Sequence, residues 1–513
     1  MKTQDLPYQQ VSANWSNRIL ILSLLGIAYL TLFPFQSPFV PTFELHRSPF
    51  LLGISGKRPS YWDFFLNVLL FVPLGFALCA KVRKRGGRRW ISLLLSLAVG
   101  AGVSYAVEFM QLYIPSRDSG WADVISNTTG SVAGFFLFEL CGGAILEVSS
   151  AIESFFRKWL LPPRVALLLA SYFIVCFGVS GVLQKETRLS NWDPRCVLFL
   201  GNDASSQSPW MGQVFQLQIW NRALPEETIR RLAARESTED ASAGLLGSYD
   251  FANSSPYQDN SNRLPALDWT PQQPRFINAR ASEVDAKSWL RTKVPVENLT
   301  REVEKSSQFT VHIVCAPAAT QVGNGRIVSL SQSADNVNFH LRQEGDDLVV
   351  WIRNPLSERH ALLAWRVPHV FEPGKERDIV ASYDGSDAFI YLDGKRAARP
   401  YRLSPGASLV HHFLYIQTSE LDGYIIVYQT LIFFPAGLLI GLATGQWAGK
   451  KLFGLWMFVL GLCLPAVLLE IFLALLSGRR IWVGNIALAL VFGLAGVLLI
   501  NADQRYKNSS VAT

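Results

Sequence analysis

Long runs of apolar residues alternate along the chain with shorter polar segments. A helix needs about 20 consecutive apolar residues to cross a bilayer. Eight runs of about that length are expected to be membrane-spanning helices, at roughly 19–36, 64–80, 90–112, 122–143, 164–183, 424–445, 452–476 and 481–500. Between the fifth and the sixth run lie about 240 residues of ordinary polar composition. The pattern predicts a polytopic α-helical membrane protein with one inserted soluble domain.

Residues 185–420 follow a different pattern, in which apolar and polar residues alternate over short runs. Alternation with a period of two is typical of strands that bury one face. Residue pairs typical of tight turns, such as Asp384-Gly385 and Asp393-Gly394, fall between the runs. Many short strands at regular spacing predict an all-β antiparallel sandwich. The runs that carry this prediction are 214–220, 326–333, 338–343, 347–352 and 387–395.

The distribution of charge predicts the orientation of the chain. The protein has 513 residues, half of them hydrophobic, and a net charge of +7. Six of the nine residues in the loop 81–89 are basic, and short basic loops stay in the cytoplasm. We therefore expect both termini to be cytoplasmic and residues 185–420 to be extracytoplasmic. The positive charge then reflects topology, so no nucleic-acid partner is expected. No small-residue cleavage pattern follows the first apolar run, so no cleaved signal is expected either.

The membrane part contains an internal repeat. An offset of 362 positions aligns 67–76 with 429–438 and needs no gap over roughly 75 residues. We therefore expect two tandem four-helix units of the same orientation, with the soluble domain in the first outer loop of the second unit. The aligned pairs that are identical or similar are Phe71 with Phe433, Pro73 with Pro435, Gly75 with Gly437, Glu108 with Glu470, Arg117 with Arg479, Asp123 with Asn485, and Gly134 with Gly496.

The second copy lacks several polar groups of the first. Gln111 is replaced by Leu473, Asp118 by Arg480, Asn127 by Ala489 and Asn67 by Gln429. Proline and glycine bend and pack helices, and a Glu–Arg pair can hold a loop, so a structural role explains the residues that both copies keep. A role in binding explains why only the first copy is complete. We therefore expect Gln111, Asp118 and Asn127 to matter more for function than for folding.

The polar residues of the first copy concentrate where the third and fourth spans meet. Glu108 and Gln111 are three residues apart, and Asp123 and Asn127 are four apart, so each pair shares one face of its helix. The fourth span continues with the small residues of "GSVAG" (130–134), which let helices approach closely. Because the two spans are antiparallel, one pocket at the outer leaflet is expected. Its expected members are Asn67, Glu108, Gln111, Arg117, Asp118, Asp123 and Asn127, with Pro73, Gly75, Gly130, Gly134, Glu470 and Arg479 in structural roles.

Three interpretations of this cluster stay open. Ionisable groups at membrane depth are costly and often functional. The first interpretation is a structural ion pair between Arg117 and Glu108 or Asp123. The second is a site for a lipid headgroup or a glycan phosphate, with Arg117 as the anion ligand. The third adds catalysis, with Glu108 or Asp123 as the general base. The cluster contains no catalytic triad, phosphate-binding loop or zinc-type spacing that would indicate a reaction.

Two segments of the first copy resemble the VanZ-like membrane family, which is named after a teicoplanin-resistance protein. The segments are "DFFLNVLLFVPLGF" (63–76) and "EFMQLYIPSRDSGWADVISNTTGSVAG" (108–134). The resemblance covers about a quarter of the chain. It implies an integral protein of the bacterial cytoplasmic membrane and no particular reaction. The residues that match the family pattern are Asp63, Asn67, Phe71, Pro73, Gly75, Glu108, Gln111, Arg117, Asp123, Asn127, Gly130 and Gly134.

The inserted domain resembles the laminin-G/concanavalin A-like lectin superfamily in 210–232, 244–251 and 377–398. The resemblance implies a jelly-roll sandwich that binds a carbohydrate or a protein. Some members bind calcium, and Asp384 and Asp393 are the candidate ligands. Aspartate before glycine is also the ordinary hairpin pair, and this turn interpretation is favoured. No other cofactor is expected.

Four further residues of this domain leave alternatives open. Trp351 and Trp365 alternate with polar residues and are candidates either for stacking on a sugar or for the core. Cys196 and Cys315 lie in the exported domain, where a disulfide is permitted. The sequence alone does not establish that pairing.

The sequence therefore predicts a VanZ-like unit with a fifth span at 1–183, a lectin-like sandwich at 185–420, and a degenerate second copy at 421–513. We expect an envelope protein that recognises a lipid-linked or amphipathic component at the outer leaflet. The exported domain is expected to engage a glycan or an envelope protein. The alternatives are a membrane enzyme acting on a lipid-linked glycan, a transporter built from parallel repeats, and an adhesive anchor.

Overall fold

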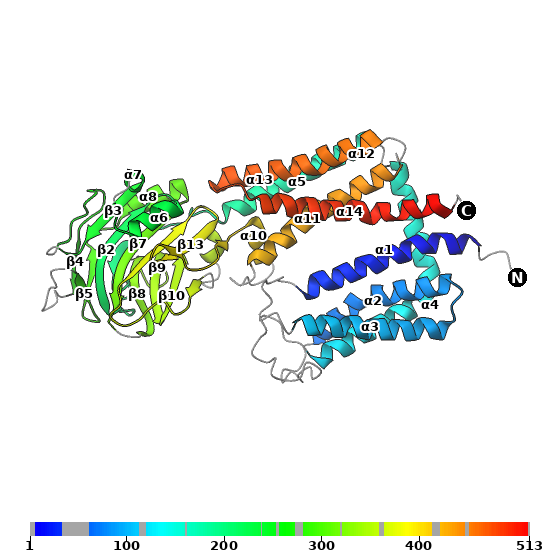
Figure 1. The fold of residues 1–513 in the computed structure, drawn as a ribbon, viewed down its shortest axis with the longest axis horizontal. Helices are drawn as coiled ribbons and strands as arrows, with labels where there is room; N and C mark the ends of the chain where they lie inside the picture. The colour runs from blue at the N-terminus through cyan, green and yellow to red at the C-terminus, as the bar shows by residue number, and fades with distance from the viewer. Residues whose placement is uncertain are drawn as a thin grey trace. The chain divides into compact units, whose positions relative to one another are not determined.

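The protein forms two compact units. The computed structural model describes residues 6–32, 61–111, 120–159, 162–236, 239–252, 256–271, 281–318, 321–358, 364–412, 421–446 and 451–510. The first unit comprises Met1–Phe173, Gln429–Ala466 and Ala487–Thr513. The second comprises Ile174–Tyr428 and Val467–Ile486. The helices of the membrane part and the strands of the inserted domain are labelled in Figure 1.

Four helices form the first bundle: α1 (Leu6–Thr31), α2 (Tyr61–Lys84), α3 (Arg89–Gln111) and α4 (Trp121–Trp159). Glycine lets α2 and α4 pack backbone against backbone. A Cβ atom added to Gly75 would lie 1.7 Å from the carbonyl oxygen of Ser131. Added to Gly130 or Gly134, it would lie 2.2 Å from the oxygen of Val68 or 2.0 Å from that of Val72. The expected small-residue contact is therefore present along two turns of α4.

Another set of helices flanks the inserted domain in the chain: α5 (Pro162–Lys185), α11 (Leu421–Gln446), α12 (Lys451–Phe458), α13 (Leu464–Ser477) and α14 (Val483–Ser510). A π-helical turn, η3 (Val459–Cys463), joins α12 to α13. It comes just before Pro465, which has no N–H to donate within the helix. The segment 451–477 is thus one continuous helical element with a local irregularity.

Seven of the described helices are long and apolar enough to cross a membrane. Seven of the eight expected spans are therefore confirmed, and the structure does not describe the eighth over its whole length. The expected span 19–36 falls on α1, whose described apolar part, Ser16–Thr31, is shorter than a full span, and residues 33–36 lie outside the described part of the chain. The seven helices are Asp63–Lys84, Arg89–Gln111, Trp121–Ile145, Pro163–Lys185, Leu421–Thr444, Gly454–Ser477 and Val483–Ile500.

The packing contacts of the first copy recur at the predicted offset of 362. Gly437 takes the place of Gly75, and its added Cβ would lie 2.0 Å from the oxygen of Gly493, which takes the place of Ser131. A Cβ on Gly496 would meet the oxygen of Phe434 at 2.5 Å, as Gly134 meets Val72. Phe71 and Phe433 are both fully buried. The repeat seen in the sequence is therefore also a repeat of helix contacts.

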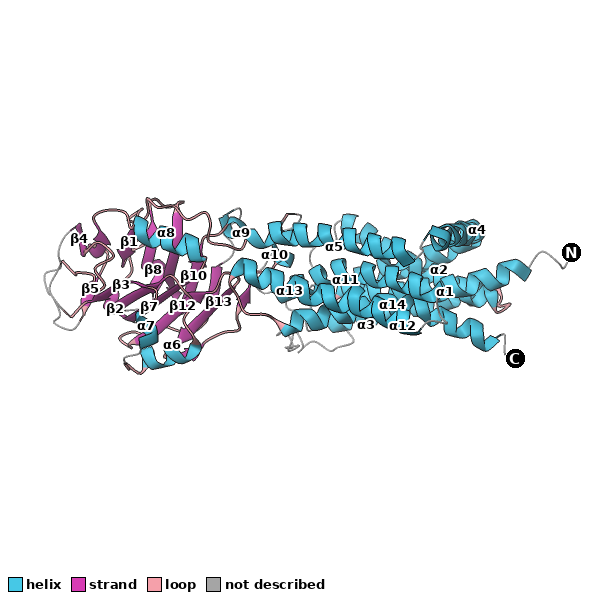
Figure 2. Ribbon diagram, turned by 90° about the horizontal axis from the view of Figure 1, so that it is seen from above, coloured by secondary structure: helices cyan, strands magenta, loops and turns pink. Residues whose placement is uncertain are grey.

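The inserted region consists of two antiparallel sheets, coloured magenta in Figure 2. Sheet A has the strand order β11-β10-β9-β8-β1-β6-β4, and sheet B has the order β14-β13-β12-β7-β2-β3, with β15 beside β13 and β5 beside β2. Phe309 of β7 and Phe339 of β9 meet edge to face with ring centroids 4.8 Å apart, so the sheets pack face to face. The strands are β1 (Val197–Leu200), β2 (Gly212–Trp220), β3 (Leu245–Asp250), β4 (Leu267–Pro271), β5 (Ser282–Val284), β6 (Ser288–Thr292), β7 (Phe309–Pro317), β8 (Gln321–Ser331), β9 (Val337–Gly345), β10 (Asp347–Ile352), β11 (Ala364–Val367), β12 (Arg377–Tyr383), β13 (Asp387–Leu392), β14 (Lys395–Arg396) and β15 (Tyr401–Arg402).

The strands predicted from alternation are confirmed as β2, β8, β9, β10 and β13, and the segment 244–251, assigned to a strand by the lectin-like resemblance, contains β3. The predicted turns are also present, because their glycines, Gly345, Gly385 and Gly394, all have positive φ. The short helices of the region are α6 (Glu226–Ala233), α7 (Glu239–Ser242), α8 (Glu297–Ser306), α9 (Pro355–Glu358) and α10 (Pro405–His411). Figure 2 shows α6 and α7 on the β7–β12 side and α8 on the opposite side.

Candidate functional site

One end of the first bundle gathers polar side chains from α2, α3 and α4. Glu108, near the end of α3, accepts a hydrogen bond from the backbone N–H of Gly120 at 2.9 Å. The Asp123 N–H in turn donates to the carbonyl oxygen of Gly120 at 3.2 Å. At the same end, Asn67 of α2 donates through Nδ2 to Asp123 Oδ1 at 2.7 Å. A carboxylate beside the N-terminus of α4 is favourably placed because the first amides of a helix point outward.

Two amide side chains extend this polar cap into the bundle. Gln111 donates to the carbonyl oxygen of Thr31 at 2.8 Å and so joins the end of α3 to the end of α1. Asn127 donates to Ser104 Oγ at 2.9 Å and is 2% exposed. Its Oδ1 is buried and has no hydrogen-bond partner among the described residues. Asn127 is therefore a buried group with spare hydrogen-bonding capacity.

The predicted pocket is thus brought together in part. Asn67, Glu108, Gln111, Asp123 and Asn127 all lie at the same end of the bundle. Glu108, Gln111 and Asn127 are buried. Asn67 and Asp123 are half-buried at the end of the bundle, which we call the mouth of the cap. Arg117 and Asp118 lie in 112–119, outside the described residues. The roles assigned to those two residues therefore stay predictions from the sequence.

The second copy repeats one bond of this cap, and its glutamate also pairs with an arginine whose counterpart, Arg117, lies outside the described residues. Trp482 takes the place of Gly120, and its N–H donates to Glu470 Oε1 at 2.7 Å. Asn485 donates to the other oxygen of Glu470 at 3.1 Å. Arg479 also donates to Glu470, at 2.5 Å, with both side chains 2% exposed. Because the same backbone N–H holds the glutamate in both copies, Glu108 and Glu470 fasten the end of one helix to the start of the next.

Other polar groups at this end of the first bundle have apolar counterparts in the second copy, although Asn67 is replaced by another amide, Gln429. Asn127 is replaced by Ala489, and its partner Ser104 by Ala466, so both members of the pair change together. Both alanines are buried. Asp63, exposed one turn before Asn67, is replaced by the buried Ile425. The second copy therefore keeps the helix packing without these groups.

A stripe of small polar residues continues from the cap along α3. Ser92, Ser96, Gly100 and Ser104 are spaced by four and buried, and Ser131 of α4 donates to the oxygen of Ser96 at 2.8 Å. At the far end, Glu139 pairs with Arg83 at 3.1 Å and Arg89 at 2.8 Å. Asp123 and Glu139 are sixteen residues apart on α4, or roughly 24 Å at 1.5 Å per residue. The two charged ends are thus separated by about the thickness of a hydrocarbon core.

The candidate calcium ligands of the inserted region have other partners. Asp384 accepts backbone hydrogen bonds from Ser386 and Asp387, as in an ordinary turn. Burial raises the pKa of Asp384, and the positive charges of Arg479 and Arg480 oppose that rise. Asp387 lies in the same turn, and burial followed by the Asp384 carboxylate raises its pKa to about 8. Calcium prefers ionised carboxylates, so these contacts favour the turn interpretation.

Asp393 lies in the two-residue hairpin between β13 and β14. Asp393 and Gly394 both have positive φ, as that turn requires. The Asp393 carboxylate accepts hydrogen bonds from Arg377 at 2.8 Å and from the backbone N–H of Asp378 at 3.1 Å. The carboxylate is thus bound within the sheet.

Among the described residues, a group of three carboxylate and imidazole ligands converges at Asp346, Asp347 and His369. Asp346 accepts from His369 Nδ1 at 2.6 Å, and this bond raises the pKa of the imidazole. Asp347 is engaged by Arg366 at 2.8 Å. His369 and Arg366 are therefore already bound to these two carboxylates.

The aromatic and cysteine candidates lie mainly in the interior. Trp365 is 2% exposed, so its face is not available to a sugar. Trp351 is half-buried and stacks on His340 at 5.6 Å. Cys196 and Cys315 are both buried and free.

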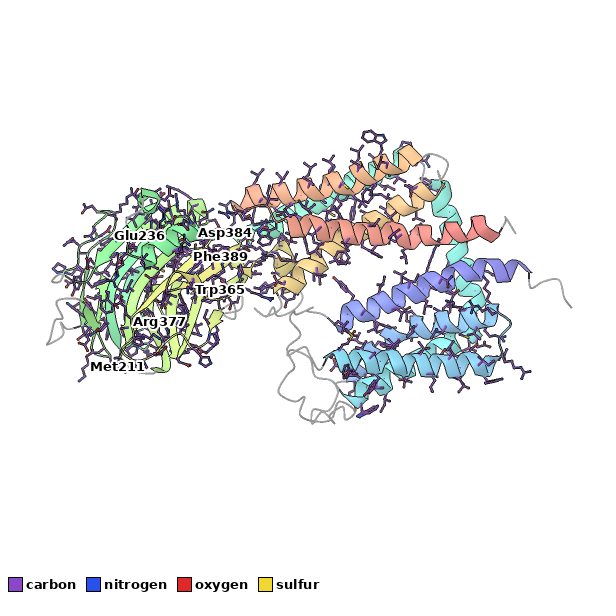
Figure 3. All side chains as sticks on the ribbon, viewed as in Figure 1. Met211, Glu236, Trp365, Arg377, Asp384 and Phe389 are labelled. Atoms are coloured by element: carbon purple, nitrogen blue, oxygen red, sulfur yellow. The ribbon has the colours of Figure 1, made fainter. Side chains whose placement is uncertain are left out.

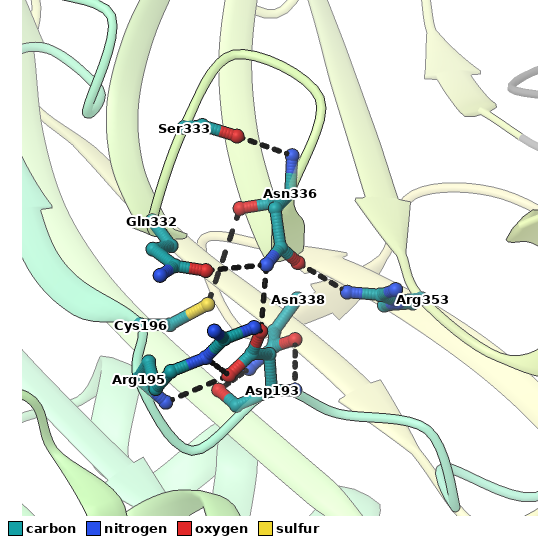
Figure 4. Close-up of polar contacts among 8 residues, drawn as sticks. All are labelled: Asp193, Arg195, Cys196, Gln332, Ser333, Asn336, Asn338 and Arg353. Atoms are coloured by element: carbon teal, nitrogen blue, oxygen red, sulfur yellow. Dashed lines mark hydrogen bonds and ion pairs between the residues drawn. The ribbon is translucent and has the colours of Figure 1, made fainter.

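Cys196 belongs to a polar network that fixes the start of sheet A (Figure 4). Arg195 binds both oxygens of Asp193, at 3.0 and 2.7 Å, and holds the pKa of that carboxyl well below its usual range. Asn336, in the loop between β8 and β9, donates to Asp193 at 2.6 Å and accepts from Arg353. The network joins the residues just before β1 to the loop between β8 and β9.

The comparison with known families concerns the first bundle. The family model described as VanZ/LLP1 matches residues 19–142. These residues form a VanZ/LLP1 domain. The polar cap described above, from Asn67 to Asn127, lies wholly within this domain. The searches of curated proteins and of solved structures gave no match. The lectin-like resemblance of the inserted region therefore stays a prediction.

Sequence reasoning missed some groups of the VanZ/LLP1 cap. Ser104 was not among the expected members, although its replacement by Ala466 parallels that of Asn127 by Ala489. Comparing the two copies at every buried polar position would have found it. Asp63 matches the family pattern but was not assigned to the pocket. The contacts of Gly120 and Thr31 are made by backbone atoms, which leave no signal in residue type.

Replacing Ser104 and Asn127 together with alanine is expected to destabilise the protein less than the sum of the two single replacements. Removing one partner leaves the other buried without its hydrogen bond, at about 1–3 kcal/mol, whereas removing both recreates the alanine pair of the second copy. Apparent melting temperatures of the three variants in detergent measure the coupling. Additive shifts would contradict the pairing.

Proposed function

We propose that the VanZ/LLP1 domain binds the headgroup of a lipid-linked or amphipathic envelope component at the outer leaflet. The observation that carries the proposal is the polar cap, in which the buried Asn127 keeps an acceptor without a partner among the described residues. Buried polar groups without partners are rare in folded proteins, and a ligand donor would satisfy this one. The second copy has alanine at the same position and keeps its packing.

The side chains at the mouth favour a headgroup that donates hydrogen bonds. Asp63 and Asp123 supply carboxylates there, and Asp123 is held by Asn67. Hydroxyl and ammonium groups are the natural partners of such acceptors. A phosphate would instead need a cation, for which the sequence offers Arg117. The basic loop 81–89 at the opposite end of the same bundle supports the placement at the outer leaflet, because short basic loops stay in the cytoplasm.

The proposal extends to the inserted region as a binding module outside the cell. Its two-sheet architecture and the resemblance to lectin-like domains support a carbohydrate or a protein as its partner.

Binding of a purified lipid-linked glycan precursor to the protein in nanodiscs tests the role of the cap. Asn67→Ala and Asp123→Asn are expected to weaken binding about 10- to 100-fold, because a hydrogen bond to a charged group contributes about 1.5–3 kcal/mol. The matched control is Gln429→Ala, which alters the equivalent of Asn67 in the second copy and should leave binding unchanged.

Binding of the same lipid to an Arg117→Ala variant tests whether the protein recognises the phosphate of the headgroup. Glu108→Gln is less informative, since Glu108 also holds the start of α4. Affinities equal to that of the unmodified protein for both Asn67→Ala and Asp123→Asn would refute the proposal.

A further inference from the structure

An open groove of about 1250 Å³ lies on the face of sheet B that points away from sheet A. Its floor is formed by β2, β7 and β12, where Gln218 and His312 are register partners. Asp378 of β12 lies one row further along the same face. One wall is formed by the C-terminal end of α6 and the residues after it, as far as Glu236, which is labelled in Figure 3.

The groove exists because α6 covers only part of this face. Ile229 of α6 and Leu224 before it pack on Trp220, Val380 and Tyr391. That apolar contact fills the end of the sheet nearest the start of β3. The neighbouring row of polar side chains is left uncovered and becomes the floor of the groove.

The floor contains a hydrogen-bonded chain of three side chains. His312 is 3% exposed, and its Nε2 lies 2.8 Å from Asp378 Oδ2. Its Nδ1 lies 3.2 Å from Gln218 Oε1, so both ring nitrogens are engaged. The other oxygen of Asp378, Oδ1, is buried and has no hydrogen-bond partner among the described residues. These hydrogen bonds fix the Asp378 carboxylate and leave its Oδ1 as an acceptor for a ligand.

The groove carries an excess of negative charge. Five acidic residues and two arginines line it. Both arginines are paired, Arg230 with Glu227 and Arg235 with Glu376, each at 2.6 Å. One of the acids, Asp393, is also paired, with Arg377 at 2.8 Å. The acids with no arginine or lysine partner among the described residues are Glu236, Asp250 and Asp378.

We infer that this groove binds a basic peptide, with a lysine ammonium group beside Asp378. The inference rests on the binding role proposed for the inserted region and specifies its partner. Charge complementarity favours a cation, and the spare oxygen of Asp378 favours a hydrogen-bond donor. The volume exceeds the roughly 300–1,000 Å³ of sites for small molecules, which favours a short chain. The described lining contains neither tryptophan nor tyrosine, whose rings would stack on a sugar.

Fluorescence anisotropy with the full-length protein in nanodiscs tests this inference. The probe is a labelled Gly-Lys-Gly-Lys-Gly peptide, compared with Gly-Ser-Gly-Ser-Gly and with a labelled chitin oligosaccharide. We expect the lysine peptide to bind at least tenfold more tightly than either alternative. Asp378→Asn, which preserves the shape of the side chain, should weaken its binding at least tenfold, and so should Glu236→Gln on the exposed rim. The matched control is Asp346→Asn, which removes an acid outside the groove.

Three results would overturn the inference. The first is tighter binding of the chitin oligosaccharide than of the lysine peptide, which would leave the binding role of the region intact. The second is equal weakening by Asp346→Asn, which would indicate a general attraction of charge. The third is unchanged binding in Glu236→Gln, a variant that needs no rearrangement of the sheet because its side chain is exposed. Melting temperatures of all variants separate loss of binding from loss of fold.

Discussion

Replacing Arg479 with alanine is expected to destabilise the protein by about 3–5 kcal/mol, the usual cost of removing one partner of a buried ion pair. Arg479 and Glu470 are each 2% exposed, and the variant would leave the Glu470 carboxylate buried without its cation. The guanidinium also lies over the Trp482 ring at 4.3 Å and donates to the carbonyl oxygen of Arg480. Thermal unfolding of the purified protein in detergent measures the effect as a drop in apparent melting temperature.

The matched control is Arg480→Ala. Arg480 is the next residue in the chain, carries the same charge and is exposed, and its backbone oxygen stays available to Arg479. Its replacement should change stability by no more than about 0.5 kcal/mol. Similar melting temperatures for the two variants would show that the buried pair does not hold this turn.

Replacing Gly75 with alanine is expected to disrupt the VanZ/LLP1 bundle. The new methyl group would lie 1.7 Å from the backbone oxygen of Ser131, so α2 and α4 must move apart. Overpacking of a core usually costs about 1–3 kcal/mol, and here the opposing atom belongs to a helix backbone that cannot turn aside. Gly437→Ala should have a comparable effect, because the oxygen of Gly493 lies 2.0 Å from the added atom. Apparent melting temperature and the yield of monodisperse protein measure both effects.

Gly102→Ala is the control for this pair of variants. Gly102 lies on the exposed face of α3, and nothing lies within 4 Å of an added Cβ. Alanine is favoured over glycine in a helix by about 1 kcal/mol, so the control should be neutral or slightly more stable. A Gly75→Ala protein as stable as Gly102→Ala would mean that α2 and α4 do not pack as closely as described.

The sequence predicted elements whose signal is local. Seven spans follow from runs of apolar residues, and β10 was predicted with the bounds that the structure gives it, 347–352. Strand β7 was not picked out, because all nine of its residues are buried and its two faces do not differ. Alternation identifies strands whose two faces differ in exposure, and a central strand whose residues are all buried does not meet that condition.

The candidate site was predictable to the level of helix ends and no further. Antiparallel spans bring Glu108 and Asp123 to the same end, and the spacing of residues shows this. The partners of those side chains are a backbone amide, Gly120, and another amide side chain, Asn67. Such partners depend on how far each helix is shifted along its axis and rotated about it. The packing of glycines against backbone carbonyl groups sets that shift and rotation. The surroundings of Asp384 were equally inaccessible, since Arg479 and Arg480 lie about 95 residues away in the chain.

The shared amide bond of Glu108 and Glu470 has a consequence for how this chain arose. The repeat runs without a gap at an offset of 362, and the bond from Gly120 recurs at Trp482. A duplicated gene segment explains both facts. The two copies differ at the positions of Ser104 and Asn127, where the second has alanine, while the fastening glutamate is present in both. The inserted region lies between α5 and α11, so it leaves the polar cap of the first copy uninterrupted in the chain.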